Sequence, residues 1–432
     1  MDMTNYSAGF ARMDITPHLG VGLNGYFDAR KGTGMLDPLY ANAIAFSDGE
    51  KTAVIIVVDS LGLYGAYGYT WPGMIEEELG LQKGSVILCS THTHTAPGVY
   101  YDKEYDNWEY RRLRDTATLA IADLKPVTDV QWAEGRAEGL TFPRRFKLND
   151  GTVMTNPAGK YVDMIVDFAC ENDDSLRLVR ILREDAKEIA VVNFQTHPDN
   201  IGGEKYSADY PGALRNRVEK FREDARCVFI NGAEGQMIPG DKRLPKVPAS
   251  HQKAIDIGNN IADFALTLFD KTVSTNTTGL FFGQKSVDLK TKRDTNRFPE
   301  AERIIKLHAE GKDEEIHPFR KQAMYMLAES RQIVRLEKAD QDYISTFVSA
   351  IAFCGFALAG IPGEPFNEVG VQIRKNSKFP ATCVSCQANG CHGYYPTDFA
   401  YDQGGYESYN TPYVKGTAEQ LADTADELLA SF

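Results

Sequence analysis

Two histidines separated by one threonine follow an apolar stretch in the segment SVILCSTHTHTAPG (85–98). In an extended strand, residues two apart project from the same face, about 6.6 Å apart along the strand. His92 and His94 could therefore bind or flank one metal ion, because imidazole is a common ligand of zinc and related metals. The alternative is a pair of ordinary surface or core histidines. We favour the metal because the chain has only eight histidines and two of them lie here.

Two other apolar stretches end in a similar way. His197 follows one of them in FQTHPDNIG (194–202), and Glu364 follows another in AGIPGEPF (359–366). The neighbouring proline or glycine predicts a sharp turn at each point. A carboxylate held in a turn offers an oxygen ligand to a hard or borderline metal ion. Taken alone, His197 is more typical of a structural histidine and Glu364 of an exposed glutamate. We consider them candidate metal ligands only because they share the pattern seen at His92.

A segment rich in glycine and tyrosine, NGCHGYYPTDFAYDQGGYE (389–407), has the composition of a binding loop. His392 and Tyr394 are its candidate ligands or hydrogen-bond donors. Elsewhere in the chain, Arg144 and Arg145 could anchor an anionic group of a substrate. A solvated pair is the commoner outcome for adjacent arginines.

The chain has seven cysteines, and Cys383, Cys386 and Cys391 form a C-x-x-C-x4-C pattern typical of soft metal sites. Cys383 lies in the apolar run ATCVSC (381–386), which is typical of a buried strand, and no second C-x-x-C occurs in the sequence. We therefore favour buried thiols over a cysteine metal site.

The elements that must position these residues alternate between strand and helix. Apolar, β-branched stretches predict strands, and amphipathic stretches predict helices. This alternation predicts an α/β fold with a mixed β-sheet core flanked by helices, in which ligands bind beyond the carboxyl ends of strands. No linker or repeat interrupts the pattern, so we expect one domain over residues 1–432. The expected strands are 52–63, 85–95, 188–197, 227–235 and two within 344–363; the expected helices include 107–126, 210–224, 248–271, 299–339 with a break near 311–318, and 417–432.

Charge and hydropathy limit the possible partners. The formal net charge of −13 disfavours nucleic acid, because its phosphates would be repelled. The longest apolar run, 348–361, is shorter than the ~18–20 residues that a membrane span needs. The N-terminal residues MDMTNYSAGF lack the basic start and apolar core of a secretory signal, which predicts a cytoplasmic location. The expected partner is a small-molecule substrate.

Together, these segments resemble the neutral/alkaline non-lysosomal ceramidase family, and in particular a single-domain bacterial relative of its catalytic domain. The resemblance implies a zinc ion held by His92, His197, Glu364 and Tyr394, with His94 lining the substrate pocket. Cys391 could align in place of Tyr394. The motifs that carry the resemblance are AGFARMDITP (8–17), DPLYANAIAF (37–46), STHTHTAPG (90–98), TH (196–197), SADYPG (207–212), NGAEGQMIP (231–239), IPGE (361–364) and GYYPT (393–397).

Two departures from the family bear on the substrate. Where the family places a catalytic serine before a proline, this chain has Ile238, and Gln236 replaces the family's acidic residue. The family also carries a further C-terminal domain and generally a secretion signal, and we expect neither here. Ceramide is therefore a doubtful substrate.

The sequence predicts a zinc-dependent hydrolase that cleaves an amide or ester bond in a small polar metabolite with metal-activated water. The alternatives are an inactive, metal-containing binding protein and a metal-dependent lyase or isomerase acting on a sugar-like substrate. We predict acid–base roles for His94 and Glu234. The candidates for substrate contact are Thr95, Arg144, Arg145, Asp209, Gln236 and His392.

Overall fold

The computed structural model describes the chain except for residues 1–2, 4, 27–28 and 98–101. Its largest element is a mixed sheet in the order β16-β14-β13-β8-β1-β5-β6-β7, with β18 beside β8. The pairs β6–β7 and β14–β16 are parallel, and the other neighbours are antiparallel. The strands are β1 (Ser7–Asp14), β5 (Tyr40–Ser47), β6 (Thr52–Val58), β7 (Val86–Ser90), β8 (Lys125–Arg136), β13 (Ser175–Arg183), β14 (Glu188–Phe194), β16 (Ala225–Asn231) and β18 (Val273–Ser274).

A second sheet packs face to face against the first. Its order is β19-β20-β21-β23, and only β21 and β23 run parallel. Apolar side chains such as Ile55 and Val57 of the first sheet meet Ile351 and Leu358 of the second in one buried cluster. The strands of the second sheet are β19 (Leu280–Lys290), β20 (Tyr343–Phe353), β21 (Phe356–Gly360) and β23 (Ala381–Ser385).

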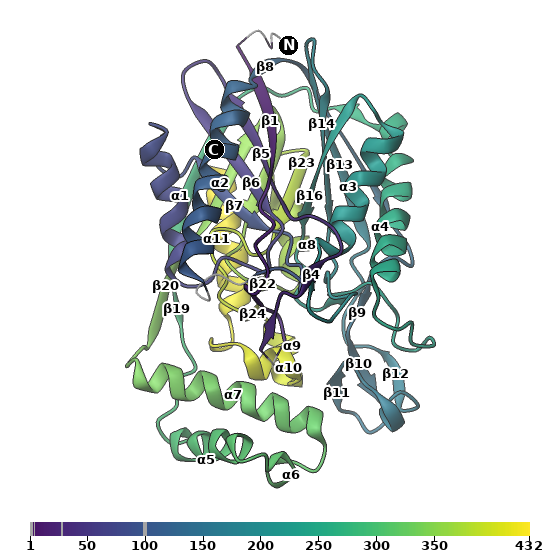
Figure 1. Ribbon diagram of the computed structural model, residues 1–432, viewed down its shortest axis with the longest axis vertical. Helices are drawn as coiled ribbons and strands as arrows, with labels where there is room; N and C mark the ends of the chain where they lie inside the picture. The colour runs from purple at the N-terminus through teal and green to yellow at the C-terminus, as the bar shows by residue number, and fades with distance from the viewer. Residues whose placement is uncertain (1–2, 4, 27–28, 98–101) are drawn as a thin grey trace.

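Helices cover the outer face of each sheet, which gives four layers (Figure 1). The first sheet is covered by α1 (Ala66–Glu78), α2 (Lys103–Ala122), α3 (Asp209–Phe221) and α4 (His251–Leu266). The second sheet is covered by α8 (Asn367–Asn376) and α11 (Thr417–Ser431). The predicted mixed α/β fold is confirmed.

Shorter elements gather toward one end of the layers. The helices α5 (Phe298–Ala309), α6 (Asp313–Ile316) and α7 (Arg320–Lys338) form an insertion between β19 and β20, with a small apolar core of its own. In Figure 1 this insertion crosses the end of the molecule beyond α9 (Asp398–Gln403) and α10 (Tyr406–Asn410). The remaining elements are β2 (Gly22–Leu23), β3 (Arg30–Lys31), β4 (Gly34–Met35), β9 (Phe142–Pro143), β10 (Arg145–Leu148), β11 (Val153–Thr155), β12 (Ile165–Phe168), β15 (Lys205–Tyr206), β17 (Met237–Ile238), β22 (Glu364–Pro365), β24 (Tyr394–Tyr395) and the 3-10 turns Gly159–Tyr161 and Phe269–Lys271.

The helix predicted over 107–126 begins and ends four residues earlier in the structure, where it is α2 (Lys103–Ala122). The helix α2 begins four residues earlier, because the Asp102 carboxylate accepts hydrogen bonds from the backbone N–H groups of Glu104 and Tyr105. Such a cap satisfies donors that the first turn otherwise leaves free. The helix ends before Pro126, which already belongs to β8. The break predicted near 311–318 is confirmed by the gaps that separate α5, α6 and α7.

No helix in the described ranges is long and apolar enough to cross a membrane.

A buried ion pair ties α3 to the end of β6. Arg215 donates from Nη1 and Nη2 to the two carboxylate oxygens of Asp59, over 2.9 and 2.5 Å. Neither side chain is accessible to solvent beyond 2%. We predict that Arg215→Leu lowers the free energy of unfolding by about 3–5 kcal/mol, because it leaves a buried carboxylate uncompensated. Urea denaturation measures the loss.

The matched control for this prediction is Arg217→Leu, which removes an exposed arginine from the same helix and breaks its surface pair with Asp263. Its unfolding midpoint should stay close to that of the wild type. Equal midpoints for the two variants would contradict the importance of the buried pair.

Candidate metal centre

Four turns bring ionisable side chains to one point. His92 follows β7, His197 follows β14, Glu234 follows β16, and Glu364 begins β22 just beyond β21. Their ligand atoms all lie within 4.8 Å of one another, and all four residues are buried. Ionisable residues that follow apolar strands in the sequence therefore lie close together in the fold.

The geometry at His92 differs from the sequence prediction. We expected His92 and His94 on one face of a strand, but β7 ends at Ser90 and both histidines lie in the turn beyond it. His92 adopts a φ of 69°, which is unusual for a residue other than glycine. Such a conformation costs about 1–3 kcal/mol and persists only where the surroundings enforce it. The turn, and not strand alternation, brings the two rings to a centroid separation of 5.0 Å.

Hydrogen bonding fixes the tautomer of His92. Its Nδ1 lies 2.7 Å from the carbonyl oxygen of Leu61, so Nδ1 carries the proton and donates it. The backbone N–H of His92 donates to the carbonyl of Ser60. Nε2 is left with a free lone pair, and it lies 3.5 Å from Oε2 of Glu364.

His197 is oriented in the same manner. Its Nδ1 contacts the backbone carbonyl of Glu234 at 3.1 Å and also the Glu234 carboxylate. Its Nε2 lies 3.3 Å from Oε2 of Glu364 and 3.4 Å from Nη1 of Arg144. Burial lowers the pKa of His197, but the adjacent Glu234 carboxylate outweighs burial and raises that pKa to about 9. A carboxylate behind an imidazole is the usual arrangement that holds a metal-binding histidine in place.

The resulting cluster suits a cation. Burial would raise the pKa of Glu364, but His92, His197 and Arg144 hold it well below its ordinary value, so the carboxylate is ionised. Among the described residues, neither Nε2 of His92 nor Oε2 of Glu364 has a hydrogen-bond partner. A lone pair that faces a carboxylate oxygen is repulsive unless a cation lies between them. Two imidazole nitrogens and one carboxylate oxygen form a donor set that zinc accepts.

Tyr394 lies beside this cluster. The strands β22 and β24 pair in parallel, and their register places Tyr394 opposite Glu364. Tyr394 is buried, and the Arg144 guanidinium lies 5.2 Å from its ring centroid. Burial, followed by the charge of Glu364, raises the pKa of its hydroxyl well above the ordinary value. The geometry is that of a candidate fourth ligand.

Cys391 lines the same cavity as Tyr394. Burial raises the pKa of its thiol, which disfavours the thiolate that would attack a substrate carbonyl. Cys383 lies in β23 and packs in the core between the sheets. No group of potential metal ligands found among the described residues includes a cysteine.

His94 is the third imidazole of the centre. Its Nδ1 lies 3.1 Å from the carbonyl of Gly25, to which it can donate, and its buried Nε2 has no hydrogen-bond partner in the described part of the chain. His92, His94 and His197 can present ligand atoms within 4.8 Å of one another. Burial lowers the pKa of His94 to about 4, which keeps the ring neutral. A side chain at Gly25 would overlap this ring, since a Cβ there would lie 2.5 Å from Nδ1.

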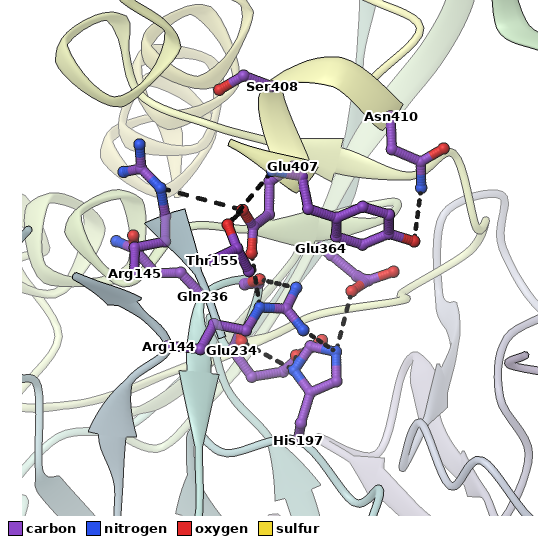
Figure 2. Close-up of polar contacts among 12 residues, drawn as sticks. Arg144, Arg145, Thr155, His197, Glu234, Gln236, Glu364, Glu407, Ser408 and Asn410 are labelled. Atoms are coloured by element: carbon purple, nitrogen blue, oxygen red, sulfur yellow. Dashed lines mark hydrogen bonds and ion pairs between the residues drawn. The ribbon is translucent and has the colours of Figure 1, made fainter. Parts of the chain in front are cut away.

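Arg144 connects the cluster to a second buried carboxylate, as Figure 2 shows. Its Nε donates to Oε1 of Glu407 at 2.6 Å, and its Nη2 donates to the carbonyl of Gly235 at 2.6 Å. Glu407 also accepts from the hydroxyl of Thr155 at 2.7 Å. Arg144 is thus held rigidly against His197. Glu407 was missed from the sequence, because nothing in the tyrosine-rich loop distinguishes it from a surface glutamate.

Arg145 lies apart from the cluster. It is only 1% exposed, its Nη2 donates to the carbonyls of Ala400 and Gly404, and its guanidinium lies 5.5 Å from the Phe366 ring centroid. Arg145 is absent from the cavity lining. The solvated pair that we weighed for Arg144 and Arg145 is wrong, because both side chains are buried.

Three other predicted substrate contacts make internal hydrogen bonds. The hydroxyl of Thr95 donates to the carbonyl of Ser207. The Asp209 carboxylate accepts from Asn200. Gln236 donates to Asn367. All three predicted residues are buried and absent from the cavity lining, so the structure gives them contacts that brace turns.

A cavity of about 770 Å³ opens onto the centre, and we call it the His–Glu cavity. His92, His94, Glu364, Tyr394 and His392 are the predicted residues in its lining. Cys391, weighed as an alternative to Tyr394, also lines it, and most of the other lining residues were not named from the sequence. The most prominent of these are Tyr26, Tyr64, Tyr406, Asn410, Arg331 and Arg335.

No protein-family model and no curated protein matches the chain. Among solved structures, it is similar to the neutral ceramidase from Pseudomonas aeruginosa, with a TM-score of 0.74 and 15% identity over 100% of this chain and 75% of that chain. A structure described as a ceramidase complexed with C2 matches with a TM-score of 0.74 and 14% identity over 99% of this chain and 75% of that chain. The chain has the neutral ceramidase fold. The resemblance expected from the motifs is confirmed at the level of this fold.

Loss of the imidazole of His92 or His197 should weaken metal binding at the candidate centre. We predict that His92→Ala and His197→Ala each lower bound zinc by about tenfold or more, the scale on which even supporting contacts of metal ligands act. Elemental analysis of the purified, zinc-loaded variants provides the measurement.

His308→Ala is the matched control, because that histidine lies in α5 and contacts Asp313, away from the cavity. It should retain the zinc content of the wild type. Full zinc occupancy in both His92→Ala and His197→Ala would show that the metal lies elsewhere.

Proposed function

We propose that the protein is a zinc-dependent hydrolase that cleaves an amide or ester bond in a small polar substrate. The observation that carries the proposal is the ionised, buried Glu364 facing Nε2 of His92 and Nε2 of His197 at the His–Glu cavity. Tyr394 is the proposed fourth ligand. Zinc bound there would supply a water with a pKa lowered to about 7 and would polarise the scissile carbonyl.

The remaining residues position groups and move protons. Glu234 is fully buried, contacts Nδ1 of His197 and is absent from the cavity lining, so it is proposed as a positioning residue in place of the acid–base role expected from the sequence. Arg144 holds His197 from the other side and carries a positive charge next to Glu364. His94 lines the cavity as a neutral imidazole, which lets its Nε2 accept a proton from the attacking water and later return it to the leaving group.

The cavity supports direct attack by water. Its described lining contains no serine or threonine, and Cys391 carries a protonated thiol. Ile238 has no nucleophilic atom and does not line the cavity. The other hydroxyls weighed as substitutes are engaged elsewhere, because Ser207 donates to Asp37 and Thr95 donates to the Ser207 carbonyl. Hydrolysis without a covalent acyl-enzyme follows.

The role of His94 separates proton transfer from metal binding. We predict that His94→Ala keeps its zinc and lowers kcat by about 10²–10⁴-fold, the usual contribution of a general acid or base. Zinc content and turnover are measured on the same preparation. Loss of zinc from this variant would instead make His94 a metal ligand.

The proposed activity predicts chelator-sensitive turnover of N-acyl or O-acyl metabolites in a substrate panel, with activity restored by zinc. Acid quench followed by intact-mass analysis should detect no acylated protein, and ceramide in detergent should not be turned over. An acyl adduct on any side chain would contradict direct attack by water. A protein that holds zinc and turns over nothing in the panel would support the inactive binding protein.

A further inference from the structure

Two arginines of the helical insertion line the His–Glu cavity. Arg331 and Arg335 lie one turn apart on α7, and both contribute to the wall of the cavity that also contains His92 and Glu364. Residues separated by four positions share a helix face, so the two side chains leave α7 on the same side. Neither was singled out by the sequence, where they resemble the many other charged residues of this helix.

Three other arginines of this region are paired with acidic residues, unlike Arg331 and Arg335. Arg293, Arg297 and Arg303 each form an ion pair with a glutamate. Both glutamates of α7 are used in this way, since Glu329 pairs with Arg297 and Glu337 pairs with Arg293. Among the described residues, neither Arg331 nor Arg335 has a carboxylate within ion-pair distance. The arrangement therefore leaves two positive charges uncompensated at the cavity.

Local contacts hold Arg335 in place. Its Nε and Nη2 both donate to Oε1 of Gln332, which also lines the cavity. Arg331 and Arg335 are both exposed to solvent, so an anion that enters the cavity can reach them. Arginine binds carboxylate and phosphate oxygens in a two-pronged geometry.

The charge of the cavity is opposite to that of the whole chain. The formal net charge is −13, yet Glu364 is the only acidic residue in the described lining, and it belongs to the metal centre. The rest of the wall offers hydrogen-bonding groups such as Asn24 and Asn410 and the rings of Tyr64 and Tyr406. Zinc at the centre would add further positive charge, so the cavity would attract anions despite the acidic surface.

We propose that Arg331 and Arg335 form an anion-binding subsite, and that the substrate is an amide or ester carrying a carboxylate, sulfate or phosphate group away from the scissile bond. This inference rests on the proposed hydrolase function. It places the scissile carbonyl at the metal centre and the anionic group against α7. A neutral lipid amide lacks the group that this wall recognises.

Hydroxamates provide the test, because the hydroxamate group chelates zinc whatever the rest of the molecule contains. The probes are monohydroxamates of straight-chain dicarboxylic acids of increasing length, each compared with its own methyl ester by calorimetry on zinc-loaded protein. We expect one or more of the free acids to bind about tenfold more tightly than its ester, a difference of about 1.4 kcal/mol. Added salt should reduce this preference.

The variants are Arg331→Gln, Arg335→Gln and the double substitution. The double variant should bind acid and ester equally, with zinc content and ester affinity unchanged. Lysine at both positions should restore part of the preference, because it keeps the charge. Arg303→Gln is the matched control, since it removes one charge from the same insertion outside the cavity lining and should preserve the preference.

Two results would overturn the inference, and they differ. If every acid and its ester bind equally and zinc-dependently to the wild type, the subsite is absent while the metal centre stands. If no hydroxamate binds zinc-dependently, the metal centre itself is wrong, and the hydrolase proposal falls together with the subsite.

Discussion

A buried carboxylate between two imidazole nitrogens is the interaction on which the candidate site depends. Glu364 is buried and ionised, and its Oε2 lies 3.5 Å from Nε2 of His92 and 3.3 Å from Nε2 of His197. Burial of a charge without compensation is strongly unfavourable, so this carboxylate needs positive charge beside it. Arg144 supplies part of the compensation, and a divalent metal would supply the rest.

The surrounding structure keeps that arrangement rigid. Each imidazole is fixed through its Nδ1 by a carbonyl, from Leu61 for His92 and from Glu234 for His197. The strained φ of His92 is maintained because its own N–H and ring both bond to the segment that follows β6. That segment begins at Asp59, whose buried pair with Arg215 anchors it to α3. Residues that never touch substrate therefore decide the geometry at the metal.

The neutral ceramidase fold alone does not determine which reaction a site carries out, because the reaction also depends on the residues that line the cavity. At 15% identity the architecture persists, while Ile238 lies where the sequence resemblance expects a serine. A fold can host several related reactions because its site is assembled from loops beyond the strand ends. In this chain the wall formed by α7 adds arginines to a cavity whose opposite side is built for a metal. In the proposed hydrolase, substrate recognition and bond cleavage would therefore depend on different elements.

The sequence by itself determined the mixed α/β fold and indicated His92, His197 and Glu364, because an ionisable residue after an apolar strand is visible in a single segment. It placed His92 and His94 together for the wrong reason, since a turn brings them close. Only the tertiary structure revealed Glu407, which balances Arg144 from 263 positions away, and the two arginines of α7. It also distinguished Arg144 from Arg145, because both approach Glu407 but Arg144 reaches His197, whereas Arg145 donates to the carbonyls of Ala400 and Gly404. Local patterns report on strands and turns, whereas charge compensation between distant segments depends on the path of the whole chain.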